Sequence, residues 1–116
     1  MNVRNAYETI GADYKGVLNR LMSEALVERF AGKFLDDPSF DKLQAAIEAG
    51  DVKEAFLAAH TLKGICQNLG FTNLFAPTSE LTEALRDASE MVDNAPALFE
   101  AVRAEYEKTV AAFRAE

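Results

Sequence analysis

The sequence predicts an all-α fold, an up-down four-helix bundle with one or two short flanking helices. The chain is rich in Ala, Leu and Glu, which favour helices, and its 116 residues include only 3 Pro and 6 Gly. No stretch alternates apolar and polar residues for long enough to indicate a strand. A chain of this length is one domain's worth, so we expect residues 1–116 to form a single helical bundle domain.

The first third of the chain is expected to hold one short and one long helix. Gly11 ends a short segment over residues 3–10, and Asp13 is a suitable N-cap for the helix that follows. This long helix is expected to run to about Leu35. Its apolar residues recur near helical spacing: Tyr14, Val17, Leu18, Leu21, Leu26, Phe30 and Phe34.

The middle of the chain is expected to hold two helices. Asp37 is a suitable N-cap for a short helix, and Pro38 at its first position loses no hydrogen bond. Gly50 is a preferred residue just past a helix, so it should end this one. Asp51 then begins the next helix with a D-x-x-E capping box, and Gly70 ends it.

Two further helices complete the expected bundle. Thr72 is expected to cap a helix running to about Met91, in which Pro77 should kink the early turns or delay their regular start. The chain breaks again around residues 94–96. The last helix carries a further apolar stripe: Leu98, Val102, Tyr106, Val110 and Phe113.

Composition and charge exclude several function classes. The 19 acidic residues outnumber the 12 Lys and Arg, giving a net charge of −7, and the dispersed basic residues argue against nucleic-acid binding. The single Cys66 cannot form an internal disulfide or a CxxC zinc site, and the single His60 leaves no His-rich site, so we expect no metal. No apolar run approaches the ~20 residues that span a membrane. The first residues do not resemble a signal peptide, so we expect a cytoplasmic protein.

Helical spacing divides the expected helix over residues 51–70 into two faces. At about 100° per residue, six residues gather on the core face: Val52, Ala55, Ala59, Leu62, Cys66 and Leu69. A second sector, centred about 120° away, holds four others: His60, Lys63, Gly64 and Gln67. His60 is therefore expected off the core face, with Lys63 and Gly64 as its neighbours at i+3 and i+4.

The neighbours of His60 suit a group carried on the imidazole. A neutral imidazole nitrogen is a nucleophile, and a phosphoryl group on it would place anionic oxygens near the Lys63 ammonium. Gly64 costs the helix about 1 kcal/mol relative to Ala, so it suggests a need for no side chain. That need is either close helix packing or access to His60, and its outward position favours access.

The segment His-Thr-Leu-Lys-Gly at residues 60–64, continued by Asn-Leu-Gly at 68–70, resembles the signature of histidine phosphotransfer (HPt) domains. The supporting context also fits, because Asp51 begins the helix nine residues before His60. The resemblance is sharpest from about residue 40 to residue 86 and is compatible with the whole chain.

The resemblance implies a helical bundle and a role for each matching residue. It implies that His60 accepts the phosphoryl group through its Nε2, that Lys63 stabilises the added charge and that Gly64 keeps the approach open. Gln67 and Arg86 are weaker candidates for lining the site. The protein would relay phosphoryl groups between receiver-domain aspartates in a two-component phosphorelay.

The resemblance also implies a carrier rather than an enzyme, without kinase activity of its own. We expect no cofactor in this chain, since the required Mg²⁺ belongs to the receiver. The expected partners are receiver domains of response regulators, a hybrid sensor kinase, or both. The chain itself is expected to be a monomer.

Two features of the resemblance stay open. Some relatives carry a Gln one residue after a Leu of the following helix, where it orients the His, but here Thr82 follows Leu81. In the family, receivers dock beside the His on apolar residues of the N-terminal helices. Four residues are candidates for such a surface, with core packing as the alternative for each: Ile10, Tyr14, Val17 and Leu18.

Two other functions are alternatives. The chain could be a non-catalytic helical adaptor or oligomerisation module in which His60 is incidental. An enzyme that uses carboxylates is the weaker alternative, because the carboxylates are spread over every helix, as on a solvated surface.

Overall fold

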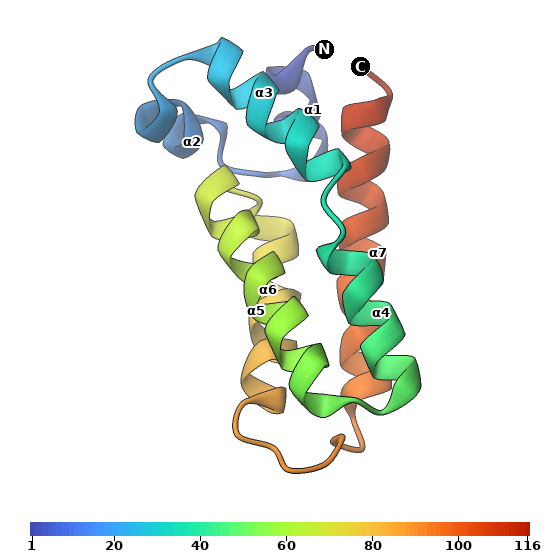
Figure 1. Ribbon diagram of the computed structural model, residues 1–116. Coiled ribbons are helices and arrows are strands. Elements are labelled where there is room, and N and C mark those ends of the chain that lie inside the picture. Colours follow the sequence, from blue (N-terminus) through green and yellow to red (C-terminus); the bar gives the residue numbers. More distant parts are fainter.

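The structure is a computed structural model of residues 1–116 that contains seven helices and no strand (Figure 1). The predicted all-α class is therefore confirmed. In chain order the helices are α1 Val3–Ile10, α2 Tyr14–Leu21, α3 Glu24–Leu35, α4 Ser39–Ala49, α5 Val52–Leu69, α6 Thr72–Leu85 and α7 Ala95–Arg114.

Helices α4 to α7 form an up-down bundle along the long axis of a molecule measuring 42 × 24 × 21 Å (Figure 1). Helix α5 packs against α4 and α6, and α7 closes the bundle against α6 and α4. Helices α1 to α3 gather at one end of the bundle, where α1 contacts α7 and both chain termini lie (Figure 1). A four-helix bundle forms as predicted. Its fourth helix is the short α4 rather than the long helix expected over residues 13–35, and α1, α2 and α3 lie at its end.

The expected long helix over residues 13–35 is two helices. Met22 adopts a left-handed conformation with φ 66°, and Ser23 is extended. The Ser23 side chain accepts a hydrogen bond from the backbone N–H of Leu26 at 3.3 Å, which begins α3 as a new helix. The sequence pattern did not indicate this break, because both helices have buried apolar residues and the apolar spacing continues from one to the other.

The ends of the central helices follow the predicted caps. Gly50 and Gly70 adopt left-handed conformations with φ 69° just after α4 and α5. The Asp51 carboxylate accepts a hydrogen bond from the backbone N–H of Glu54 at 3.2 Å, as the capping box predicts. At the start of α4 the N-cap is Pro38 rather than the expected Asp37, and the helix begins at Ser39. The Asp37 carboxylate still accepts a hydrogen bond from the backbone N–H of Ser39 at 2.8 Å.

Helix α6 differs from the prediction at both ends. Its N-cap position is Phe71, which makes no side-chain cap, and the Thr72 hydroxyl instead donates to the Gly11 carbonyl at 3.3 Å. The helix ends at Leu85, about a turn and a half before the expected Met91, because Arg86 is extended. Pro77 lies inside the helix.

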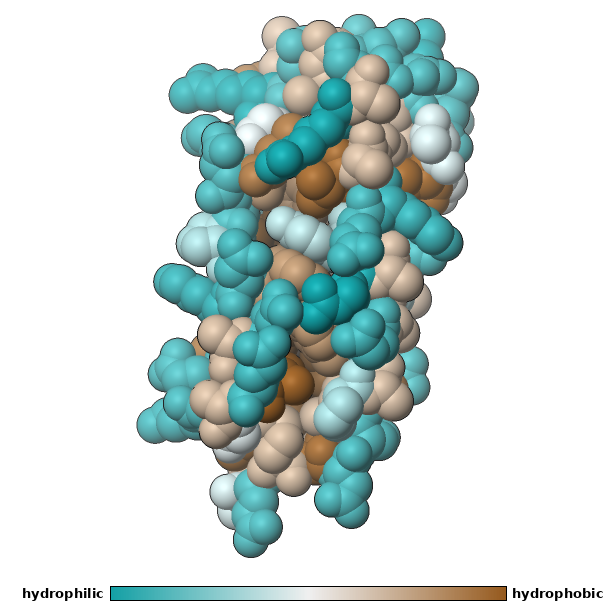
Figure 2. All heavy atoms as spheres, turned by 90° about the vertical axis from the view of Figure 1, so that its right-hand side faces the viewer, coloured by the Kyte–Doolittle hydropathy of each residue, from teal (hydrophilic) through white to brown (hydrophobic).

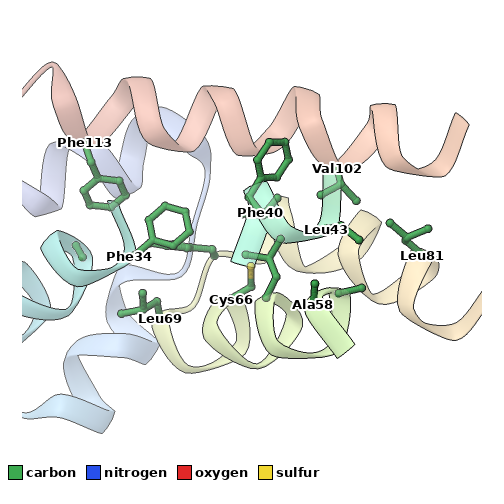
Figure 3. Close-up of a cluster of buried hydrophobic side chains, with 14 of the residues drawn as sticks. Phe34, Phe40, Leu43, Ala58, Cys66, Leu69, Leu81, Val102 and Phe113 are labelled. Atoms are coloured by element: carbon green, nitrogen blue, oxygen red, sulfur yellow. The ribbon is translucent and has the colours of Figure 1, made fainter. Parts of the chain in front are cut away.

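One cluster of 25 buried hydrophobic residues runs through the molecule. Figure 3 shows Ala58, Cys66 and Leu69 of α5 facing into this core, across from Phe34 and Phe113. On the face seen in Figure 2, hydrophilic side chains lie along both edges and also cross the middle, with apolar atoms exposed between them. No helix combines the length and the apolar content that crossing a bilayer requires.

The first twenty residues hold the C-terminal end of α5. The buried Tyr7 hydroxyl donates to the Leu69 carbonyl at 2.6 Å, and the Asp13 N–H donates to the Gly70 carbonyl at 2.8 Å. The Arg20 guanidinium donates to the Asn68 carbonyl at 3.0 Å. Groups from α1, from α2 and from the turn between them thus pair with carbonyls at a helix end that would otherwise lack partners.

Replacing Gly70 or Gly50 by Ala tests how closely the Asp13 backbone packs against Gly70. Both variants place a Cβ at a left-handed residue, which costs about 1 kcal/mol. At Gly50 that Cβ meets nothing within 4 Å, whereas at Gly70 it would lie 2.8 Å from the Asp13 carbonyl oxygen. We expect Gly50→Ala to lower the free energy of unfolding by about 1 kcal/mol and Gly70→Ala by about 2–3 kcal/mol. Urea unfolding measures both, and equal losses would contradict the contact with Asp13.

Candidate functional site

Helix α5 carries the candidate site on a face about 120° around the helix from its core stripe. The predicted core face is confirmed except at Val52, which is half-buried, and Ala58 joins it. The buried residues are Ala55, Ala58, Ala59, Leu62, Cys66 and Leu69. His60 is exposed, as the spacing predicts, so its ring is open to a second molecule.

The His60 ring lies against Phe56, one turn earlier on the same helix. The two rings are stacked, with centroids 5.8 Å apart and planes 17° from parallel. The Arg86 guanidinium lies over the same Phe56 ring, 5.0 Å from its centroid. Phe56 therefore links His60 to Arg86, which comes from the end of α6.

Lys63 and Arg86 share one carboxylate. Lys63 Nζ donates to Glu83 Oε1 at 3.4 Å, and Arg86 donates through Nε to Oε2 at 2.9 Å and through Nη2 to Oε1 at 3.1 Å. The hydrogen bonds from Arg86, and secondarily from Lys63, hold the pKa of Glu83 well below its usual range. The same carboxylate raises the pKa of Arg86. The site thus presents two cations, one from each of two elements, with one carboxylate between them.

The surface above Gly64 is open. A Cβ placed on Gly64 would meet no atom within 4 Å. No neighbouring helix therefore approaches so closely that it requires a glycine here.

Gln67 and Thr82 have different surroundings. Gln67 is exposed one turn beyond Lys63, on the predicted row. Thr82 is fully buried, and its hydroxyl donates to the Thr78 carbonyl within α6 at 2.7 Å. The Thr82 hydroxyl is thus engaged by its own helix, and the ring that lies beside the His60 imidazole is that of Phe56.

The four residues expected on a docking surface divide into two groups. Ile10, Tyr14 and Leu18 are half-buried, so part of each faces solvent. Val17 is 0% exposed, so it belongs to the core, and the expectation that it faces a partner is corrected. The exposed apolar side chains of α3 and of the turn before it lie elsewhere: Met22, Leu26 and Phe30.

A cavity of about 310 Å³ lies beside the C-terminal half of α5. Ile65 and Asn68 of α5 line one side, and Phe30 and Lys33 of α3 line another. Cys66 lies inside the core, where burial raises the pKa of its thiol to about 12. No group of three or more His, Cys, Asp or Glu side chains is arranged to hold a metal ion.

The structure adds Phe56 and Glu83 to the residues chosen from the sequence. Phe56 precedes His60 by four residues, so helical spacing alone could have placed it in the same row. Glu83 precedes Arg86 by three residues, the spacing of an ion pair on one helix. Its contact with Lys63 joins residues 20 apart in the chain, and no local pattern indicates that contact.

Comparison with known families gives one match. A family model described as Hpt domain matches residues 26–114, which cover most of α3 and all of α4 to α7. Helices α1 and α2 lie outside the matched residues. Neither the curated proteins nor the solved structures include a significant match.

Proposed function

The chain belongs to the Hpt domain family, whose members serve in general as phosphocarrier modules without kinase activity in two-component phosphorelays, and we propose that His60 carries the phosphoryl group here. The observation that supports His60 most strongly is its exposure on the face of α5 that the core stripe leaves free. It is also the single histidine of the chain.

The proposed transfer takes a phosphoryl group from an aspartyl phosphate of a receiver domain. The free imidazole nitrogen of His60, Nε2, attacks phosphorus while the bond between phosphorus and the aspartate oxygen breaks. The aspartate leaves as a carboxylate, and the ring proton stays on Nδ1. The reverse reaction passes the group to an aspartate of a second receiver.

Lys63 and Arg86 are the proposed partners of the phosphoryl oxygens. Lys63 lies one helical turn from His60. Arg86 lies over the Phe56 ring, which is itself stacked with the His60 ring. Cations fixed beside a position where negative charge builds up stabilise that charge. Gln67 lies one turn further and could donate its side-chain amide to the same group.

The proposed partner is a receiver domain, supplied by a response regulator or a hybrid sensor kinase. The open surface above Gly64 leaves room for its aspartate to approach in line with His60. The exposed parts of Ile10, Tyr14 and Leu18 are proposed to take part in docking. The Mg²⁺ that the transfer requires would be held by the receiver, and the chain would act as a monomer without a cofactor.

Replacement of His60 by Gln should abolish phosphoryl transfer to this chain. The experiment incubates the protein with a phosphorylated receiver domain and Mg²⁺ and measures a label that is labile in acid and stable in alkali. Gln cannot form the phosphorus–nitrogen bond, so we expect complete loss of this label with the fold unchanged. Label persisting on His60→Gln would refute the site, and no label on the parent chain with any cognate receiver would favour the adaptor function.

Replacement of Gly64 by Leu should slow transfer without weakening the helix. Leu fills the approach to His60, so we expect a rate at least roughly tenfold lower, together with a helix stabilised by up to about 1 kcal/mol. Gly32→Leu is the matched control, because Gly32 is also helical and open and lies on α3. Unchanged transfer kinetics in Gly64→Leu, or equal slowing in both variants, would contradict the access argument.

A further inference from the structure

The arrangement of charges around His60 assigns a role to Glu83, which is not among the residues that the family signature supplies. We propose that Glu83 competes with the phosphoryl group for Lys63 and Arg86, and so limits how strongly the site retains that group. This inference rests on the proposed function of His60.

Glu83 contacts both cations of the site at once. Its Oε1 accepts from Lys63 at 3.4 Å and from Arg86 at 3.1 Å, and its Oε2 accepts from Arg86 at 2.9 Å. Lys63 stands on α5 and Glu83 on α6, so the carboxylate joins the two helices that carry the site. The Lys63 side chain is 22% exposed and the Glu83 side chain 52%, so water and salt partly screen this pair.

Each cation is related to His60 through a residue of α5. Lys63 is the i+3 neighbour of His60 on α5. Arg86 lies over the Phe56 ring, and that ring stacks on His60. A phosphoryl group on the exposed ring would lie within reach of these cations, and the Glu83 carboxylate is already bound to both.

A phosphoryl group brings about two negative charges to the site. Glu83 is ionised at neutral pH, as glutamate ordinarily is, and the hydrogen bonds from Arg86 and Lys63 lower its pKa further. The carboxylate then repels the phosphoryl group and occupies the donors that would bind it. A carrier must also release its phosphoryl group, and a site that bound it too firmly would gain uptake at the expense of transfer.

Replacement of Glu83 by Gln tests this role. Gln keeps the size of the side chain and removes its charge, so Lys63 and Arg86 become available to the phosphoryl group. The probe is phosphoramidate, which transfers its phosphoryl group to imidazole as its phosphorus–nitrogen bond breaks and ammonia leaves. The measurement is the fraction of phosphohistidine at equilibrium with fixed concentrations of phosphoramidate and ammonia. We expect the loading constant of Glu83→Gln to exceed that of the parent about two- to fivefold, the range for exposed charge pairs.

Two variants serve as controls. Glu83→Asp keeps the charge and should load like the parent chain. Glu100→Gln removes a similar pair on α7, where Arg103 binds Glu100 at i+3 and lies over Phe99. This variant should also load like the parent, because α7 packs against α6, α1 and α4 and not against α5, which carries His60. High salt should reduce the difference between Glu83→Gln and the parent, since it screens exposed charges.

The outcomes separate this inference from the proposed function. A parent chain that takes no phosphoryl group on His60 removes the proposed function itself. If the parent is loaded and Glu83→Gln loads equally well, Glu83 does not compete for the cations. A lower loading constant in Glu83→Gln would also overturn the inference, because it would mean that Glu83 only holds Lys63 and Arg86 in place.

Discussion

One face of α5 packs into the bundle, and this packing fixes the direction of the face that carries His60. Small and medium side chains such as Ala55, Ala59 and Cys66 bring α5 close to its neighbours. Because a helix turns about 100° per residue, burial of this stripe holds His60 toward solvent. The candidate site therefore stands on a regular helix rather than on a loop, which holds the ring, Lys63 and Gly64 in a constant relation.

The N-terminal helices complete this framework at one end. Tyr7, Asp13 and Arg20 pair with carbonyls at and just after the last turn of α5. The matched family residues begin only at residue 26, so these contacts come from outside the match. The same segment carries the half-buried Tyr14 and Leu18, so the part of the chain that supports α5 also lies where a partner is proposed to dock.

Local patterns predicted much of this architecture. The helix ends at Gly50 and Gly70 and the cap at Asp51 followed from single residues with strong conformational preferences, and the exposure of His60 followed from helical spacing. The break at Met22 was missed because the apolar spacing continues across it. The Lys63–Glu83 pair was missed because it depends on how α5 and α6 pack, and a local pattern carries no information on contacts between helices.

The most direct test of the account is to locate the phosphorus atom. The chain would be labelled with ¹⁵N in its single histidine, loaded by a phosphorylated receiver domain and studied by ³¹P and ¹⁵N nuclear magnetic resonance. The account predicts one phosphorus signal coupled to Nε2 of His60 and a matching change in the imidazole resonances. A loaded chain with unchanged imidazole resonances, or with phosphorus on a carboxylate, would contradict it.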